Sequence, residues 1–439
     1  MKMLHKSPKV LYSHDIFSTQ YIGGISRYIF ELFIRNDNAT IPLVYSENLY
    51  LNRYKKRTHF KGKIRIIRLI NELKERIILQ NIMFDIYHIS YYKRTKIPQS
   101  TAFIVTIHDM IHEIYADSYF KNDAKTSKLK RLNCQNADGI IAISQQTKRD
   151  LIEIFGISEN KIRVIYQAHS LKKPNFTISL QHLPKDYILF VGTRSGYKNF
   201  INFAKAMVVI YKHYPHIKAL CVGSEFSDDE SDFLESLGIK NIFITHLATE
   251  SELYYIYKNA LCFVFPSLYE GFGIPILEAF FTQTPILLSD INIFREIAKE
   301  AAFYFNPHDI NAIADAILQA IDDTKLTQRK VALATKRLAD FSWDKTYKQT
   351  LEFYSEILAI KRGEISVNIK SDSADIVGDA RIANGGGQNA NKTQNVAKKQ
   401  NANKPQITES YIFILYLAFK DSKDAINLAQ IPPLSLRCA

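Results

Sequence analysis

The sequence predicts an α/β protein with two parallel sheets, each covered by helices. In the first third of the chain, short β-rich runs alternate with helical patterns, as in "KVLYSHD", "SRYIFELFIRN", "AFIVTIHD" and "GIIAISQQTKRDLIEIFG". Such alternation is typical of parallel strands joined by crossover helices. The runs "YILFVGT", "IKALCVGS", "NIFITHL", "CFVFPS" and "PILLSD" repeat the pattern further on. We therefore expect two α/β halves, joined near 172–185.

Length and composition agree with this organisation. A chain of 439 residues is longer than one hydrophobic core usually serves, and 46% hydrophobic with 23% charged residues is ordinary for a globular protein. The four cysteines are scattered, as expected in a reducing compartment. We find no apolar run that suits a signal peptide, and none near the roughly 20 residues of a membrane span. We expect a cytoplasmic protein.

The character of the chain changes after about residue 363. From Glu364 to Gln406 it is rich in Asn, Gln, Lys and Gly, as in "NGGGQNANKTQNVAKKQNANKPQ". Such a composition buries too little apolar surface to fold, so 363–408 is predicted to be a disordered linker. The remainder, 409–439, is a short apolar segment whose role stays open.

The charge is strongly basic. Lysine and arginine total 57 against 44 acidic residues, a formal charge of +13, which favours an anionic partner. Much of this charge lies in Arg53–Arg76, where apolar residues recur at near-helical spacing: Ile64, Ile67, Leu69, Ile70 and Leu73. This pattern predicts a basic amphipathic helix that docks on an anionic membrane, or a solvated helix whose apolar stripe packs on its own domain. Nucleic acid is not the expected partner, because the segment offers aliphatic rather than aromatic side chains.

The stretch "PSLYEGFGIPILEA" carries two carboxylates eight positions apart, Glu270 and Glu278. Pro275 suits the first turn of a helix, so Glu270 should lie in a loop and Glu278 one turn inside the helix. Gly271 and Gly273 let backbone amides approach a ligand, and the helix amino end favours an anion. The pattern suits a phosphorylated ligand flanked by hydroxyl-bearing rings. The alternative is a first-turn acid and an exposed loop acid.

Two further loops offer candidate binding groups for an anion. In "ILFVGTRSGYKNF", Arg194 and Lys198 follow a buried strand and could clamp a diphosphate, or they could form an ordinary basic loop. In "YIGGISRYIFEL", Gly23 and Gly24 precede an amphipathic helix, either as a second anion site or as a simple turn.

A histidine completes the candidate set. In "FIVTIHDMIHEIY", His108 and Asp109 end a β-branched run at a strand's carboxyl end, although a lone histidine is commonly structural. The acidic run Asp228–Asp232 contains the nearest approach to an Asp-x-Asp metal motif, and we interpret it as a solvated loop or helix start. No metal site is predicted.

Taken together, these motifs resemble the retaining, nucleotide-sugar-dependent glycosyltransferases of group 1 (family four), which have the GT-B fold. Bacterial mannosyl- and rhamnosyltransferases of surface-polysaccharide assembly are particularly similar. The resemblance runs from about Val10 to Ala359 through "GGISRY", "TIHD", "ISQQTKRDL", "FVGTRSGYKN", "SLYEGFGIPILEA" and "AAFYFNPHD". "VIYQAHSL" departs from the "NGVD" form common in the family, so we expect the interdomain hinge to differ in detail.

The resemblance implies two Rossmann-like domains that face a cleft. The acceptor domain would be 1–180, the sugar-nucleotide domain 181–345, and 346–362 a helix that crosses back to the first domain. It implies that Glu278 holds the ribose and Glu270 the donor sugar, while Arg194 and Lys198 bind the diphosphate. The implied donor-binding set is Gly24, Arg194, Lys198, Gly271, Phe272, Gly273 and Glu278, and the implied catalytic set is His108 and Glu270.

The resemblance also implies a function. We expect retaining transfer of a hexose, mannose from GDP-mannose by first guess, to a glycan or isoprenoid-linked acceptor in lipopolysaccharide, O-antigen or capsule synthesis. Because Arg194, Lys198 and the helix ends supply positive charge, we expect that the enzyme needs no metal or other cofactor. The basic helix would allow peripheral docking at the inner membrane surface. Retention could use a covalent glycosyl-enzyme or, as we favour, attack on the face that the diphosphate leaves. The alternatives are a catalytically inactive scaffold of the same fold and a nucleic-acid-binding protein.

Overall fold

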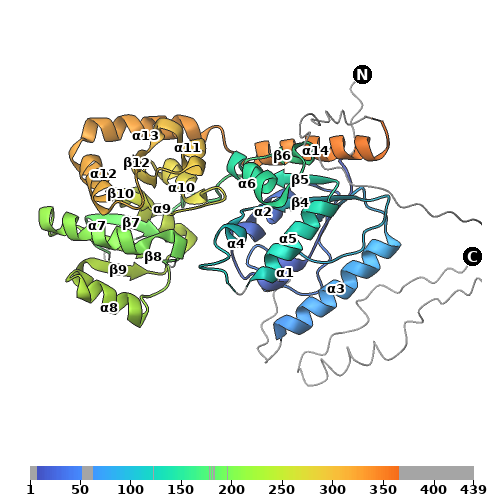
Figure 1. Ribbon diagram of the computed structural model, residues 1–439, viewed down its shortest axis with the longest axis horizontal. Helices are drawn as coiled ribbons and strands as arrows, with labels where there is room; N and C mark the ends of the chain where they lie inside the picture. The colour runs from blue at the N-terminus through green and yellow to red at the C-terminus, as the bar shows by residue number, and fades with distance from the viewer. Residues whose placement is uncertain are drawn as a thin grey trace, which may run out of the picture. The chain divides into compact units, whose positions relative to one another are not determined.

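The computed structural model describes residues 7–51 and 63–364, apart from 122, 177, 179, 181, 182 and 195. These residues form two six-stranded sheets, one in each half of the chain, shown with their helices in Figure 1. The strand orders are β2-β1-β3-β4-β5-β6 and β12-β11-β10-β7-β8-β9. Every strand pair is parallel, so the α/β prediction with two Rossmann-like sheets is confirmed.

The first sheet and its helices precede residue 165. Its strands are β1 (Val10–Tyr12), β2 (Ala39–Thr40), β3 (Ile86–Ile89), β4 (Ala102–Ile107), β5 (Gly139–Ala142) and β6 (Ile162–Val164). Its helices are α1 (Asp15–Thr19), α2 (Gly24–Phe33), α3 (Lys63–Asn81), α4 (Ile111–Ile114), α5 (Ala124–Asn136), α6 (Gln145–Phe155) and the 3-10 turn η2 (Glu159–Lys161).

The second sheet begins at residue 187. Its strands are β7 (Tyr187–Val191), β8 (Lys218–Val222), β9 (Phe243–His246), β10 (Cys262–Phe265), β11 (Ile286–Ser289) and β12 (Phe303–Phe305). The α-helices are α7 (Phe200–His213), α8 (Asp228–Ser236), α9 (Glu250–Asn259), α10 (Ile274–Thr282), α11 (Asn292–Ala298), α12 (Ile310–Asp322), α13 (Thr324–Leu338) and α14 (Trp343–Lys361). The 3-10 turns are η3 (Gly196–Lys198), η4 (Lys240–Ile242) and η5 (Lys299–Ala301).

Both faces of each sheet are buried. Side chains alternate across a strand, so neighbouring residues of a doubly covered strand must enter different cores. Val10 and Leu11 of β1 belong to separate hydrophobic clusters, as do Ile188 and Leu189 of β7. This explains why these strands are uninterrupted apolar runs in the sequence.

The carboxyl ends of the strands position the functional candidates. His108 follows β4, the Gly192–Lys198 loop follows β7, and the Pro266–Gly273 loop follows β10. Parallel strands present their carboxyl ends at one edge of a sheet, which is where open α/β sheets bind ligands.

Helix α14 follows the second sheet in sequence but packs on the first (Figure 1). A Cβ on Gly139 of β5 would lie 2.7 Å from Phe353 and 2.9 Å from Ile357, so glycine permits the close approach of this helix. The Trp343 indole donates a hydrogen bond of 2.9 Å to Ser170, and Lys361 pairs with Asp138 at 2.8 Å.

Three predicted segments lie wholly or partly outside the described residues: the basic segment, the linker and the final apolar segment. Residues 53–62 of the basic segment lie outside the described residues, as do 365–439, which hold nearly all of the predicted linker and the apolar segment. Within the described ranges, no helix combines the length and the apolar character that crossing a bilayer requires.

Candidate active site

The loop before α10 lies directly against the end of β4. A Cβ on Gly271 would lie 1.8 Å from the carbonyl oxygen of His108, so only glycine fits at this contact. Beside it, the Tyr269 hydroxyl accepts a hydrogen bond of 3.0 Å from the Met110 amide and donates one of 2.8 Å to Asp150. The two sheets thus contribute loops to one site.

Lys198 and Glu270 form the centre of this site. Lys198 Nζ lies 2.5 Å from Glu270 Oε1, and the Ser267 hydroxyl donates to the same oxygen at 2.8 Å. Burial lowers the pKa of Lys198, but the Glu270 carboxylate outweighs it and leaves a net increase. The lysine therefore remains a cation in a largely enclosed position, which suits binding of a phosphate.

Glu278 occupies a drier environment in the first turns of α10. Burial raises the pKa of its carboxyl from 4.5 to about 7, against the lowering effect of the Tyr257 hydroxyl, which donates a hydrogen bond of 3.1 Å. One carboxylate oxygen thus has a protein partner. A carboxylate held this way can accept hydrogen bonds from the vicinal hydroxyls of a ribose.

Two helix amino ends meet near these carboxylates. Gly273 has φ 94° and begins α10, and the glycine pair Gly23–Gly24 begins α2. The nearest neighbour of a Cβ placed on Gly24 would be Ile274, at 3.8 Å. Gly273 offers no side-chain cap, so the amino end of α10 presents backbone amides and partial positive charge to a ligand. At α2 the Gln20 side chain already accepts a hydrogen bond of 3.1 Å from the Ser26 amide, which leaves the Gly24 end of the helix for a ligand.

His108 lies on the first-sheet side of the site. Its ring meets the Tyr28 ring edge to face, with centroids 5.1 Å apart. Burial, more than any neighbouring charge, lowers the pKa of His108 to about 4. The imidazole is therefore neutral at pH 7 and can hydrogen-bond a sugar hydroxyl without carrying charge.

Arg194 and Phe272 have other partners in this structure. The Arg194 guanidinium binds both carboxylate oxygens of Glu230, at 2.9 and 3.0 Å, and the carbonyls of Ser224 and Glu225. The Phe272 ring packs against Tyr166 and Phe341, with centroid distances of 6.1 and 6.0 Å. The predicted diphosphate contact of Arg194 and donor contact of Phe272 stay predictions.

Several site residues were missed by sequence reasoning. The Tyr257 hydroxyl bonds Glu278, and the Ser267 hydroxyl bonds Glu270. Tyr269 anchors the loop that carries Glu270 by bonding Asp150. Arg27 of α2 reaches Glu250 of α9 at 3.0 Å. Ser267 stands three residues before Glu270, a spacing that could have signalled a local contact. Nothing local marks the Tyr257–Glu278 contact or the Arg27–Glu250 pair, because these partners are distant in sequence.

A buried charge cluster near the carboxyl end of β1 is close enough to share a metal ion. The ligand atoms of His14, Asp15 and Glu72 lie within 4.8 Å of one another. However, Lys93 Nζ lies 2.9 Å from Asp15 Oδ2 and 3.4 Å from Glu72 Oε2, so an ammonium already supplies the positive charge. Hydrogen bonding by His14, and then the Lys93 charge, lower the pKa of Glu72 to about 2.

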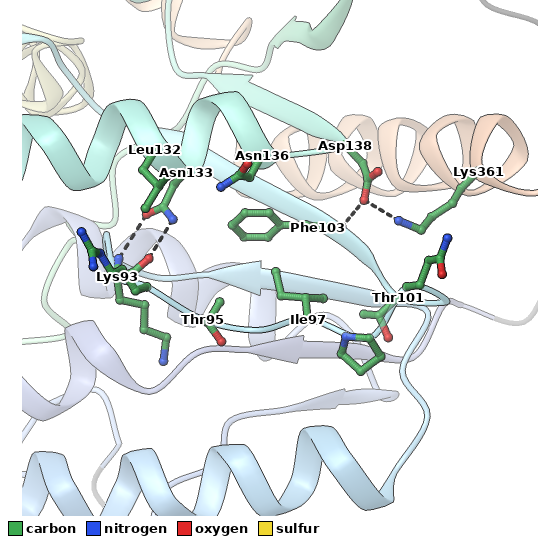
Figure 2. A pocket seen from close by; sticks show the side chains of 13 residues that line it. Lys93, Thr95, Ile97, Thr101, Phe103, Leu132, Asn133, Asn136, Asp138 and Lys361 are labelled. Atoms are coloured by element: carbon green, nitrogen blue, oxygen red, sulfur yellow. Dashed lines mark hydrogen bonds and ion pairs between the residues drawn. The ribbon is translucent and has the colours of Figure 1, made fainter. Parts of the chain in front are cut away.

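A cavity of about 440 Å³ lies elsewhere, at the amino end of β4 and β5 (Figure 2). Figure 2 shows that two of its polar side chains are paired: Asp138 binds Lys361 and the Phe103 amide, and Asn133 exchanges two hydrogen bonds with the Lys93 backbone. We assign no donor contact to this cavity, because the candidate residues lie at the opposite ends of the strands.

The two parallel six-stranded sheets have the GT-B-like arrangement of glycosyltransferases. The chain belongs to the glycosyltransferases of group 1 and family 4. The model of "Glycosyltransferase Family 4" matches residues 22–172, and that of "Glycosyl transferases group 1" matches residues 172–337. The resemblance inferred from the motifs is confirmed.

Similar proteins of known name include O-antigen enzymes. The chain is 29% identical over 215 residues to the O-antigen chain mannosyltransferase RfbU of Salmonella typhimurium, covering 48% of this chain and 59% of RfbU. It is 25% identical over 317 residues to O-antigen chain mannosyltransferase B of Escherichia coli, covering 66% of this chain and 79% of that protein. It is 27% identical over 272 residues to the serotype-specific mannosyltransferase WbdA of Escherichia coli, covering 58% of this chain and 33% of WbdA.

Solved structures share the fold. Sucrose-phosphate synthase from Thermosynechococcus elongatus matches with a TM-score of 0.63 and 16% identity, over 81% of this chain and 100% of that one. Anabaena Alr3699/HepE, solved in complex with UDP-glucose, matches with a TM-score of 0.58 and 16% identity, over 80% and 100%. At this identity the likeness concerns the fold alone.

Proposed function

We propose that this enzyme transfers a hexose, mannose in the first instance, from a nucleoside-diphosphate sugar to a glycan or isoprenoid-linked saccharide, with retention of configuration. The observation that carries the proposal is the Lys198–Glu270 pair beside the amino end of α10. The named mannosyltransferase relatives support mannose and an O-antigen acceptor, and the UDP-glucose complex of HepE supports a nucleotide-sugar donor.

The donor would lie across the loop from Glu270 to Glu278. In this arrangement Glu278 accepts hydrogen bonds from the ribose, Lys198 and the helix amino ends hold the diphosphate, and Glu270 orients the sugar hydroxyls. We propose that the amides of Gly24, Gly271 and Gly273 and the backbone of Phe272 also contact the donor. Arg194 would join the diphosphate by exchanging the Glu230 carboxylate for a phosphate.

Transfer requires cleavage of the bond between the anomeric carbon and the diphosphate. Negative charge grows on the leaving phosphate as the sugar becomes cation-like, and preorganised positive groups stabilise that charge most effectively. The acceptor oxygen forms its bond to the anomeric carbon on the face that the diphosphate leaves. The acceptor proton passes to the departing phosphate oxygen, while neutral His108 hydrogen-bonds the sugar.

A transfer assay tests this function. Purified protein is incubated with GDP-mannose and a lipid-linked saccharide acceptor, and the new linkage is analysed by NMR. We expect GDP release that depends on the acceptor and an α-linked product from the α-linked donor. A β-linked product would contradict retention, and a glycosyl adduct on Glu270 in mass spectrometry would contradict the same-face route.

We also propose that α3 docks this enzyme peripherally on an anionic membrane, at the cytoplasmic face where a lipid-linked acceptor would lie. The inner face of the helix is mixed: Ile67 and Leu79 are buried there, and so are polar residues. The Asn71 side-chain amide bonds the Val44 backbone, and Glu75 bonds Tyr87 and Lys93. The outer face of the helix exposes apolar side chains, each 38–60% accessible: Ile64, Leu69, Leu73 and Ile77.

Charge favours the same partner. Arg65 and Arg68 lie on the exposed side of α3 beside Leu69, and each basic residue near an anionic surface contributes about 1 kcal/mol. The test is flotation with neutral phosphatidylcholine vesicles and with vesicles containing phosphatidylglycerol. Leu69→Ser should reduce recovery on anionic vesicles, whereas Ile201→Ser, an equally exposed change on α7, should not. Equal recovery with both lipids would remove the proposal.

A further inference from the structure

A chain of buried polar groups runs beneath His108. His88 of β3 hydrogen-bonds Tyr354 of α14 through Nδ1 at 2.6 Å and Thr106 of β4 through Nε2 at 2.8 Å. The Thr106 hydroxyl lies 3.4 Å from that of Tyr28, whose ring is the edge-to-face partner of His108. These contacts connect α14 to the candidate catalytic histidine.

Every member of this chain except His108 is sealed from solvent. Tyr28, His88 and Tyr354 are 0% exposed and Thr106 is 4% exposed. Burial, and then the nearby His108, lower the pKa of His88 to about 3, so its ring is neutral. A neutral imidazole has one donor and one acceptor nitrogen, and the two hydroxyls satisfy both in either tautomer. Buried polar chains of this kind rigidify what they touch when all members are paired.

Packing and an ion pair fix helix α14, which carries Tyr354, on the first sheet. Phe353 and Ile357 pack against Gly139 on either side of Tyr354, and the far end of the helix is fixed by the Lys361–Asp138 pair visible in Figure 2. The helix follows α13 of the second half. Its packing on the first sheet therefore connects the second half to the polar groups beneath His108. The donor contacts described above do not involve His88 or Tyr354.

We propose that His88 and Tyr354 are positioning residues for sugar transfer, which hold the His108 ring in its working orientation through Thr106 and Tyr28. The proposal rests on the role of His108 in the proposed function. It assigns to α14 a part in catalysis beyond joining the two halves, since displacement of the helix would release the His88 ring.

The test uses full-length Tyr354→Phe, which removes one hydroxyl and keeps the ring, together with His88→Gln and Thr106→Val. Ser355→Ala is the matched control, because it removes a hydroxyl from the exposed face of the same helix. Two quantities are measured: kcat and KM with GDP-mannose, and the NMR signal of the His108 ring in histidine-labelled protein. The signal is assigned by its absence in His108→Gln.

We expect kcat to fall at least threefold in Tyr354→Phe and His88→Gln, with the donor KM changed less than twofold, and the His108 signal to move. Ser355→Ala should match the wild type in both. Unchanged kcat and an unmoved His108 signal in folded Tyr354→Phe and Thr106→Val would overturn the proposal. If His108→Ala retains full kcat, the role of His108 fails, but the NMR signal still decides whether α14 positions its ring.

Discussion

The ammonium of Lys198 lies 2.5 Å from the carboxylate of Glu270, although 72 positions separate the two residues in sequence. Each neutralises the charge of the other. A bound diphosphate would compete with Glu270 for Lys198 and free that carboxylate for the sugar hydroxyls. The pair thus links the two ends of the proposed donor.

Lys198→Met should reduce kcat about a hundredfold or more, because it removes a preorganised cation from the leaving phosphate. Lys212→Met, on the exposed end of α7, is the control and should leave the rate unchanged. The measurement is steady-state transfer at saturating donor. Wild-type kcat in Lys198→Met would exclude the lysine from leaving-group stabilisation.

Gly24→Ala should weaken donor binding without affecting folding. The added methyl group would meet Ile274 only at ordinary contact distance, 3.8 Å, so the free protein accommodates it. A phosphate that approaches the Gly24 amide would collide with it. Calorimetric titration with GDP is expected to give a Kd at least tenfold higher at an unchanged melting temperature. Unchanged affinity would show that the ligand does not approach this glycine.

Gly271→Ala should destabilise the protein by about 1–3 kcal/mol, the usual cost of overpacking. The new Cβ would lie 1.8 Å from the His108 carbonyl oxygen, and backbone must move to relieve that contact. Denaturant unfolding of the variant against wild type measures the loss. Equal stability of the two proteins would mean that the loop does not rest on β4.

The partly buried Glu278 makes stability depend on pH. Its folded-state pKa of about 7 exceeds the ordinary value of 4.5, so the folded protein binds this proton more tightly. The resulting stabilisation is complete below about pH 4.5 and is lost as the pH rises through 7. Glu278→Gln should therefore raise the melting temperature relative to wild type at pH 8 and by less at pH 5. Glu352→Gln, an exposed change on α14, should show no such difference.

Transfer should not require a divalent metal, because Lys198 and the helix amino ends already supply positive charge at the proposed diphosphate. We expect activity to survive dialysis against EDTA. Activity abolished by EDTA and restored by magnesium would contradict this mechanism.

Much of the fold follows from local signals. Alternating strand and helix patterns predict both sheets, and Pro275 after two glycines predicts where α10 begins and hence where Glu270 and Glu278 lie. The interpretation of Asp228–Asp232 as a helix start is confirmed, because Ser227 and Glu230 form a capping box at the start of α8.

Contacts between distant residues could not be predicted in this way. Glu230 in the first turn of α8 binds Arg194 of the loop after β7, and Tyr354 reaches His88 across 266 positions. The burial of the apolar residues of α3 could not be predicted either. Ile67 is buried, whereas Ile64 and Leu69 are exposed. Periodicity indicates that a helix forms but not which partner covers it.

The most direct measurement is a thermal-shift panel with UDP, GDP, dTDP and ADP and their sugars, on wild type and on Glu278→Ala. A ligand that binds only the folded state raises the melting temperature. We predict a rise with one of these nucleotides and its sugar in the wild type, lost in the variant. No rise with any of them in folded wild type, or an equal rise in Glu278→Ala, would contradict the proposed donor site.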